Sequence, residues 1–560
     1  MSSTSLPDAS APPDGGADAA APGRPGGWAA VAARSWPVAG AVAGMAAFGL
    51  WGLERDSSMG NDEVATRWAA RLPLHGLAHL LSHVDAVHGL YYLLMHGWMA
   101  IGTSPAAMRI PSVISMTAGA AMIAVIGRRL TGSGWAGLFG GLVMALTPTI
   151  TYYAQTARSY ALVVACVLGA TLVLLHALAA EVAGRRASRW WLGYGALVTL
   201  GGYLNELSLL MLAAHAVTVL MARYGRKTVG HWLAASAAGA VLVVPLLAIS
   251  ARQSAAVGWI PRPGLWSLRI LFHDYFGATT TAAVLLLVCA VVAVLPPIRG
   301  WRRAGEGPAE AETEVAWWRR DGVSLPSVAA PLLVVPGAVL LLESLVARPL
   351  YVDRYVLYGE AGAALLAGAG VWRIGRWLAD VAGRPRSAAD SQAAAAGARS
   401  GAAGRSALLW TPGVIVCACA LLLQLAPQQR VRTPQSRLFD FGGPSRYLAT
   451  RADQGDGVLF LSSFYRKARL GYPADFGKVT DFAMAVSPTA AGTFQGVDKP
   501  VAAIRALMGQ QNRIWVFGRS PFAPTLAGPS QAEAIALRQQ FTLVSEHRFR
   551  GIFVTLWLPR

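Results

Sequence analysis

The sequence predicts an all-α polytopic membrane protein that carries a C-terminal α/β domain. Three observations lead to this prediction. Apolar segments of roughly 17–23 residues, a length that crosses a bilayer, recur along most of the chain. Hydrophobic residues make up 54% of the 560 residues and charged residues only 14%. The last part of the chain is different, because short β-rich runs alternate there with helical stretches.

The apolar segments divide the chain into three parts. Residues 1–36 are rich in Pro, Gly, Ala, Ser and Asp and cannot bury a core, so we expect a disordered cytosolic tail. Residues 37–426 form the membrane domain, and residues 427–560 form the α/β domain. We expect about eleven spanning helices, near 37–53, 109–127, 133–151, 158–180, 189–205, 206–222, 230–250, 279–298, 326–346, 355–372 and 407–426.

The distribution of arginine predicts the orientation. Arg-rich connections alternate with connections that contain Asp, Glu, His, Tyr and Trp, and the positive-inside rule places the Arg-rich ones in the cytosol. The N-terminus is then cytoplasmic, and the C-terminal domain lies outside the plasma membrane. The net charge of +19 does not indicate nucleic acid, because many of the arginines occupy these short connections. All four cysteines fall in apolar runs, which supports neither a disulfide framework nor a zinc site.

The first outer connection, residues 54–108, is long and apolar. Within it, residues 85–102 are too short for a comfortable span, and counting them as one would place the next Arg pair outside. On a helical wheel one face is polar and the other apolar, so we expect an amphipathic helix lying in the outer interface. The polar face holds Asp85, His88, Tyr92 and His96, and the opposite face holds Leu90, Leu94 and Trp98.

Two adjacent carboxylates follow the first apolar segment, in the stretch "GNDEVATR". Asn61 is a good helix N-cap, and Asp62 and Glu63 suit a first helical turn because they interact with the helix dipole. The alternative is that the pair contains a general base at the membrane surface. This stretch alone does not decide between the two.

Further polar side chains lie at the outer ends of the predicted helices. Taken singly, each has an ordinary explanation: Arg158 as a snorkelling flank, Arg354 and Tyr355 as interfacial anchors, the histidines as an interfacial polar face. Their convergence on one side of the membrane favours a site. The candidate catalytic residues are Asp62, Glu63 and Asp85, and the candidate substrate-binding residues are Arg158, Tyr160, Arg354, Tyr355, His88 and Arg109.

Five short motifs, in this order, carry a family resemblance. They are "NDEVATR" (61–67), "DAVHGLYYLLMHGW" (85–98), "RIPS" (109–112), "YAQTARSY" (153–160) and "DRYVLY" (353–358). Together they resemble the polyprenyl-phosphate-sugar-dependent membrane glycosyltransferases of GT-C type, a group that includes protein O-mannosyltransferases, lipid A aminoarabinose transferases and Rgt-like transferases. The resemblance covers roughly residues 40–375.

The resemblance implies interfacial helices in the first outer loop and places Asp62 where the family has its catalytic acidic residue. Many members have a Pro-Pro pair before the "LYYLL" stretch, whereas this chain has Val87, His88 and Gly89. The departure concerns the acceptor side of the site, which this helix borders.

The residue types suit sugar transfer from a lipid phosphate. The phosphate leaving group needs positive charge, for which Arg158 and Arg354 are candidates, with Tyr160 and Tyr355 as hydroxyl donors. A hydroxyl acceptor needs a carboxylate to take its proton, and Asp62 fits, with Glu63 or Asp85 as a positioning partner. We expect a polyprenyl-phosphate donor carrying a mannose-like hexose or a pentose, and a cell-envelope glycan or protein acceptor. No cofactor is expected; a divalent metal is possible but not indicated.

Two other classes of protein compete with this interpretation. A transporter or flippase of lipid-linked saccharides would show inverted repeats, broken helices and charges near the bilayer midplane. No clear repeat is visible, and the charges cluster at the outer ends. A membrane-anchored scaffold would not need eleven spans and would leave the loop carboxylates without a role.

Overall fold

The computed structural model describes residues 27–54, 58–295, 322–382 and 398–560. Most of the predicted tail, residues 1–26, lies outside the described residues, as does the Arg-rich connection at 299–320. Helix α1 (Gly27–Leu50) begins before the expected boundary at residue 36, so the last part of the predicted tail is helical. Residues 37–560 form one unit, and every contact described below lies within it.

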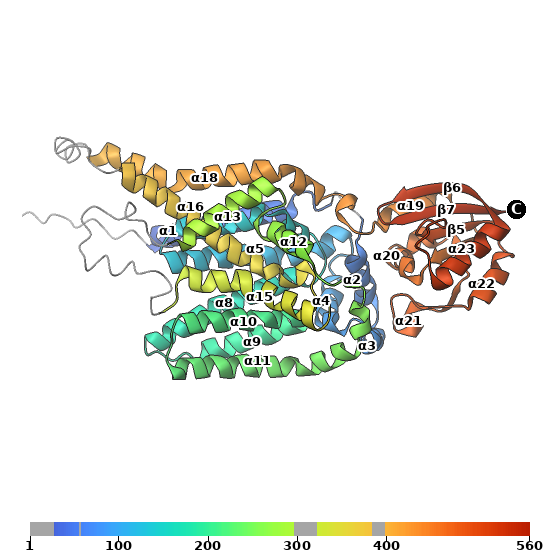
Figure 1. Ribbon diagram of the computed structural model, residues 1–560, viewed down its shortest axis with the longest axis horizontal. Helices are drawn as coiled ribbons and strands as arrows, with labels where there is room; N and C mark the ends of the chain where they lie inside the picture. The colour runs from blue at the N-terminus through green and yellow to red at the C-terminus, as the bar shows by residue number, and fades with distance from the viewer. Residues whose placement is uncertain (1–26, 55–57, 296–321, 383–397) are drawn as a thin grey trace, which may run out of the picture. The chain divides into compact units, whose positions relative to one another are not determined.

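In the described residues, each segment predicted to span contains at least one helix (Figure 1). The helices at these positions are α1, α5 (Pro105–Thr131), α6 (Gly134–Leu146) with α7 (Pro148–Ala154), α8 (Tyr160–Val182), α9 (Ser188–Leu204), η2 (Glu206–Leu210) with α10 (Met211–Met221), α11 (Arg226–Arg252), α13 (Thr280–Val294), α15 (Leu325–Val346), α16 (Glu360–Ala382) and α18 (Ala398–Arg430).

Five of the described helices are long and apolar enough to cross a membrane. The count rises to seven if two bent pairs, each bent by 72°, are single spans: α6 with α7, and α12 (Leu265–Phe276) with α13. The chain is therefore a multi-pass membrane protein. The expected total of about eleven spans stays a prediction, because α9, for example, has only 17 residues.

Breaks in the helices bring polar side chains to one end of the bundle. Pro148 occupies the first turn of α7, where its missing N–H costs no hydrogen bond, and the chain bends there out of α6. A short non-helical segment, residues 155–159, then leads into α8. Before α16, the irregular 3₁₀ turn η6 (Asp353–Gly359) likewise brings polar side chains to this end of the bundle. Arg158 and Arg354 both sit in these irregular segments.

The first outer connection folds into short helices: α2 (Asn61–Arg71), α3 (Leu74–His83), η1 (Ala86–His88) and α4 (Gly89–Trp98). Helix α4 has 10 residues, about 15 Å at 1.5 Å per residue, which is too short to span. The expected direction of its polar stripe was wrong. Tyr92 and His88 are buried, whereas Leu93 and Leu94 are 48% and 47% exposed, so the stripe faces the protein interior rather than the membrane surface.

The C-terminal domain contains a five-stranded sheet in the order β2-β1-β5-β7-β6. Strands β1 and β2 are parallel, as are β1 and β5, whereas β7 is antiparallel to both β5 and β6. The β-rich runs at 457–463, 513–519 and 552–558 correspond to β1, β5 and β7, whereas β2 and β6 were not predicted. The strands are β1 (Asp456–Leu461), β2 (Val479–Asp481), β5 (Ile514–Gly518), β6 (Phe541–Phe549) and β7 (Ile552–Pro559), with a separate β3 (Met484–Val486) and β4 (Val497–Asp498) pair.

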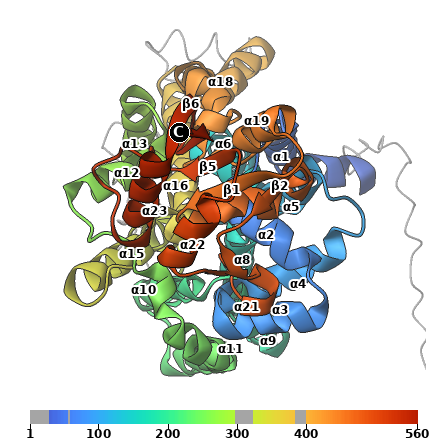
Figure 2. The same ribbon diagram turned by 90° about the vertical axis from the view of Figure 1, so that its right-hand side faces the viewer.

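Helices pack beside this sheet: α19 (Gly442–Arg451), α22 (Val501–Met508) and α23 (Gly528–Gln540), close to the helical stretches expected from the sequence at 444–452, 501–510 and 530–541. The domain lies against the first outer connection (Figure 2), where α21 (Pro488–Ala491) is next to α3 and α20 (Lys467–Gly471) packs on α2. Arg67 of α2 donates a hydrogen bond to the Gly471 carbonyl over 3.2 Å. The backbone N–H of Met59 donates to the Tyr472 hydroxyl over 2.7 Å.

Candidate active site

Asp62 lies in the first turn of α2 with its carboxylate partly exposed. The Tyr160 hydroxyl donates to Asp62 Oδ2 over 3.5 Å, and Arg354 Nε donates to the same Tyr160 hydroxyl over 2.9 Å. The three side chains come from α2, α8 and η6. They form a line from carboxylate to phenol to guanidinium that connects the first outer loop to two later helices.

The charges around Asp62 keep it ionised. Burial acts to raise the pKa of this carboxyl, but the positive charges of Arg158 and Arg354 outweigh burial, and the pKa lies below its ordinary value. A partly exposed carboxylate that is ionised at neutral pH can accept a proton from an approaching hydroxyl. The geometry of Asp62 therefore fits a general base.

A second cluster joins Asp85, Tyr92 and Arg158. Arg158 Nη1 donates to the Tyr92 hydroxyl over 2.7 Å, and Arg158 Nη2 lies 3.3 Å from Asp85 Oδ2. The Tyr92 hydroxyl also donates to Asp85. Asp85 has a φ of 63°, in the left-handed region, and its carboxylate holds Arg158 from this turn. Burial opposes ionisation, yet Arg158, His88 and the Tyr92 hydrogen bond lower the pKa of Asp85 to about 2.

His88 lies beside this cluster and is neutral. Burial and the nearby Arg158 charge lower its pKa to about 4, and its Nε2 is 4.0 Å from Asp85 Oδ1. Within the described part of the chain, His88 Nδ1 and Arg158 Nε are buried without a hydrogen-bond partner. Buried polar atoms are normally satisfied, so these two mark places where a polar ligand can bind.

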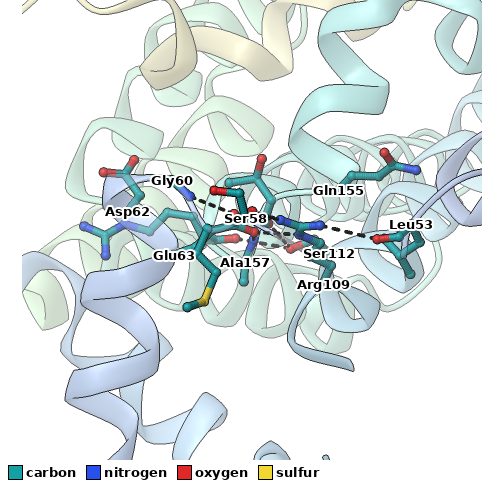
Figure 3. A network of polar contacts seen from close by, with 12 residues as sticks. Leu53, Ser58, Gly60, Asp62, Glu63, Arg109, Ser112, Gln155 and Ala157 are labelled. Carbon is teal, nitrogen blue, oxygen red and sulfur yellow. Dashed lines mark hydrogen bonds and ion pairs between the residues drawn. The ribbon is translucent and has the colours of Figure 1, made fainter. Parts of the chain in front are cut away.

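Glu63 faces away from Asp62, into a buried polar network (Figure 3). Arg109 Nε and Nη2 donate to its two oxygens over 2.8 and 3.0 Å, and both residues are 1% exposed. The backbone N–H of Ala157 donates over 3.1 Å, that of Gly60 over 3.2 Å, and Arg437 lies 3.6 Å away. Gly60, not Asn61 as expected, is the helix N-cap.

This network contains two of the residues that the sequence placed at the site, Glu63 and Arg109. Burial raises the pKa of Glu63, but Arg109, Arg437 and the hydrogen bonds bring it down to about 2. Glu63 is neither exposed nor directed at Asp62, and the guanidinium of Arg109 is directed at Glu63. This geometry suits a pair that positions α2, and the catalytic role expected of Glu63 and the substrate-binding role expected of Arg109 stay predictions.

Three aromatic rings surround the Arg354 guanidinium. The ring centres of Tyr160, Trp259 and Tyr355 lie 5.8, 5.6 and 5.5 Å from its central carbon. Cation–π contacts of this kind hold a guanidinium in place without using its N–H donors. Arg354 is only partly buried, so its remaining donors can contact an anion. Trp259, which reads from sequence as an ordinary interfacial aromatic residue, is part of this environment.

Lys467 of α20 also lies at this site and, like Tyr92 and Trp259, was not among the site residues expected from the sequence. Its Nζ donates to Asn61 Oδ1 over 2.7 Å, although the two residues are 406 positions apart. The stretch around it contains no motif that distinguishes this lysine from others in the domain. Among the described residues, no group of three or more His, Cys, Asp or Glu side chains could hold a metal ion. The cations and hydroxyls that face the site are instead suited to an anion.

Comparisons with known proteins bear on the family and the fold. Residues 89–249 match the family described as dolichyl-phosphate-mannose-protein mannosyltransferase. The crystal structure of ArnT from Cupriavidus metallidurans in the apo state is similar with a TM-score of 0.57 at 12% identity, covering 94% of this chain and 98% of that one. The same protein bound to undecaprenyl phosphate gives 0.52 at 13% identity, covering 95% and 98%. No curated protein sequence matches the chain.

The fold and the family match point to one class of protein, the polytopic membrane glycosyltransferases. The chain has the fold of ArnT, and the family match covers the part of the membrane domain that contains Tyr92 and Arg158. These findings confirm the resemblance to the GT-C glycosyltransferases: the family model matches part of the membrane domain, and the whole chain has the fold of a solved member of that group.

Proposed function

We propose that this protein transfers a sugar from a polyprenyl-phosphate donor to a hydroxyl group of a cell-envelope acceptor, on the outer face of the plasma membrane. One observation carries the proposal: a partly exposed, ionised Asp62 stands among the cations Arg158 and Arg354 at the end of the helix bundle. A base beside an anion-binding pair is what the reaction requires.

The two arginines suit the donor phosphate. Arg158 is held by Asp85 and Tyr92 but keeps a buried Nε without a partner in the described residues. Arg354 is held by Tyr160 and the surrounding rings and is partly exposed. Guanidinium groups stay charged, and their planar geometry lets two N–H groups donate hydrogen bonds to one phosphate. They therefore stabilise the phosphate as its negative charge grows.

The reaction balances with these groups alone. The acceptor oxygen attacks the anomeric carbon, and the bond from that carbon to the phosphate oxygen breaks. The bonding electrons leave with the phosphate, which changes from a monoanionic diester to a polyprenyl phosphate with greater negative charge. The acceptor proton passes to Asp62. The Tyr160 hydroxyl is hydrogen-bonded to both Asp62 and Arg354 and so holds the base close to the phosphate site.

The structure of ArnT bound to undecaprenyl phosphate supports a lipid-phosphate donor by fold similarity. We propose a mannose-like hexose or a pentose as the sugar, and a glycan or protein as the acceptor. The orientation follows from the Arg-rich connections, which leave the C-terminal domain outside.

One feature expected of a transporter is present: α6–α7 and α12–α13 are broken helices. A flippase for lipid-linked saccharides is therefore the second candidate. The carboxylate beside two arginines at the end of the bundle favours transfer, because a flippase has no need of a base.

A membrane assay distinguishes the two candidates. Membranes containing the protein are incubated with defined polyprenyl-phosphate sugars whose sugar is radiolabelled. Transfer predicts label on a new acceptor and release of free polyprenyl phosphate, both absent from membranes carrying Asp62→Asn. Movement of intact donor across the bilayer without cleavage would support the flippase and overturn the proposal.

A further inference from the structure

A buried lysine of the C-terminal domain lies beside the proposed base. Lys467 is 7% exposed, and its Nζ donates to Oδ1 of Asn61, the neighbour of Asp62, over 2.7 Å. The rings of Phe464 and Phe494 lie 4.8 and 5.5 Å from the ammonium. Asn61 is neutral, so this hydrogen bond does not neutralise the ammonium. Among the described residues, no carboxylate lies within 4.0 Å of this ammonium, and burying a charge at a distance from its counter-charges is costly, which points to further compensation by an anion.

Lys467 changes the net charge of the site. Asp62, Asp85 and Arg158 are the charged side chains that interact with its ammonium. With Arg354, which interacts with Asp62, the site without Lys467 holds two carboxylates and two guanidinium groups, whose charges cancel. His88 is neutral near pH 7, because its pKa is lowered to about 4. Lys467 therefore gives the site one positive charge in excess.

We propose that Lys467 is a third cation of the donor-phosphate site, supplied to the membrane domain by the C-terminal domain. The proposal rests on the proposed function, since it takes the anion to be the phosphate of a polyprenyl-phosphate donor. A single excess positive charge matches a monoanionic phosphodiester. The attraction between the site and the phosphate becomes stronger as the phosphate gains negative charge during transfer.

The position of α20 gives this role a structural basis. Arg67 of α2 donates to the Gly471 carbonyl at the end of α20 over 3.2 Å. A Cβ atom on Gly471 would meet Val64 Cγ2 at 2.8 Å, so α20 approaches α2 closely only because this residue is glycine. The C-terminal domain thus holds its lysine against the helix that carries the proposed base.

The titration of Lys467 provides a signature that a structural role would lack. Burial lowers its pKa to about 8, against the opposing effect of Asp62 and Asp85 and with a contribution from Arg158. The ammonium is charged below this pH and neutral above it. Affinity for a lipid phosphate should therefore fall as the pH rises through about 8.

Binding of polyprenyl phosphate to the purified full chain tests the proposal, because this compound has no sugar to transfer. Lys467→Met should weaken binding about 10-fold or more, the usual scale for losing a charge-assisted contact. Lys467→Arg should keep most of the affinity and lose the decrease near pH 8, because arginine stays charged. Lys478→Met is the matched control: Lys478 is an exposed lysine of the same domain that donates to the Ala449 and Ala452 carbonyls.

The outcomes separate the two proposals. Absence of polyprenyl phosphate binding to the wild-type chain contradicts the proposed function itself. Wild-type binding with equal affinity in Lys467→Met and an unchanged pH profile overturns the role of Lys467 and leaves the proposed function standing. If Lys467→Met does not fold, the pH profile of Lys467→Arg decides: a profile equal to that of the wild type overturns the proposal.

Discussion

At the scale of single residues, the two arginines of the site are held by different partners. Arg158 uses two of its nitrogens on Tyr92 and Asp85, whereas Arg354 uses its Nε on Tyr160 and is otherwise surrounded by aromatic rings. Both arrangements depend on the planar guanidinium. A lysine ammonium has the same charge but cannot reproduce the fork.

We therefore expect Arg158→Lys and Arg354→Lys to lower turnover while leaving the amount of protein in the membrane unchanged. A contact of this type contributes about 1.5–3 kcal/mol, or roughly 10- to 150-fold in rate. Initial rates with a saturating donor measure the effect, and the unfolding temperature in detergent serves as the control. Unchanged rates in both variants would mean that these arginines only anchor their helices at the membrane interface.

The pH dependence of the rate follows from Asp62. Its folded pKa lies below the ordinary value of 3.8, so the base is ionised above that pH and becomes protonated only as the pH falls below it. We expect kcat/KM to show no acid limb between about pH 5 and 7. A limb centred near pH 6 would mean that a different group accepts the proton.

At the scale of secondary-structure elements, the Glu63–Arg109 pair fixes α2 against α5. The pair is buried and bidentate, and the Ala157 N–H ties it to the segment that presents Arg158. Removing one partner leaves a buried charge uncompensated. The loss in the free energy of unfolding is therefore larger than the stabilisation that the intact pair contributes.

We expect Glu63→Gln to lower the free energy of unfolding by about 3–5 kcal/mol, measured by denaturant unfolding in detergent. The combined change of Glu63→Gln with Arg109→Gln should destabilise the protein by less than the sum of the two single changes. Strict additivity would show that the two side chains do not depend on each other.

Hydrophobic periodicity predicted the elements well, because long apolar helices and buried strands carry their pattern locally. The direction of the α4 stripe was not predictable in this way. The wheel identified Asp85, His88 and Tyr92 as one face, but whether that face meets water or Arg158 depends on a partner far along the chain. Strand β6 was missed because five of its nine residues, Glu546 and His547 among them, are exposed and do not form an apolar run.

At the scale of the whole molecule, the site is assembled from distant parts of the sequence. The motifs predicted Asp62, Asp85, Arg158, Tyr160 and Arg354 because each follows or precedes an apolar segment at one end of the bundle. Lys467 was not predictable. Its contact with Asn61 spans 406 positions, and its local sequence resembles any solvated helix start.

The topology of the first outer connection is testable with a cysteine at position 104. We expect Ser104→Cys to react with a membrane-impermeant maleimide from outside, because α4 is too short to span. The parent chain, whose Cys419 is exposed, gives the background. Labelling only from the cytosolic side would mean that residues 85–102 cross the membrane.

In the proposed reaction, Asp62 accepts the proton of the acceptor hydroxyl. Asp62→Asn keeps the size of the side chain and its place in the first turn of α2, and it removes the proton acceptor. Glu54→Gln, an exposed change shortly before the same helix, is the matched control. The measurement is single-turnover sugar transfer by purified protein, alongside the unfolding temperature. We expect Asp62→Asn to fold normally and its transfer rate to fall by about 10²–10⁴-fold. Glu54→Gln should keep full activity. Full activity in Asp62→Asn would contradict this role of Asp62.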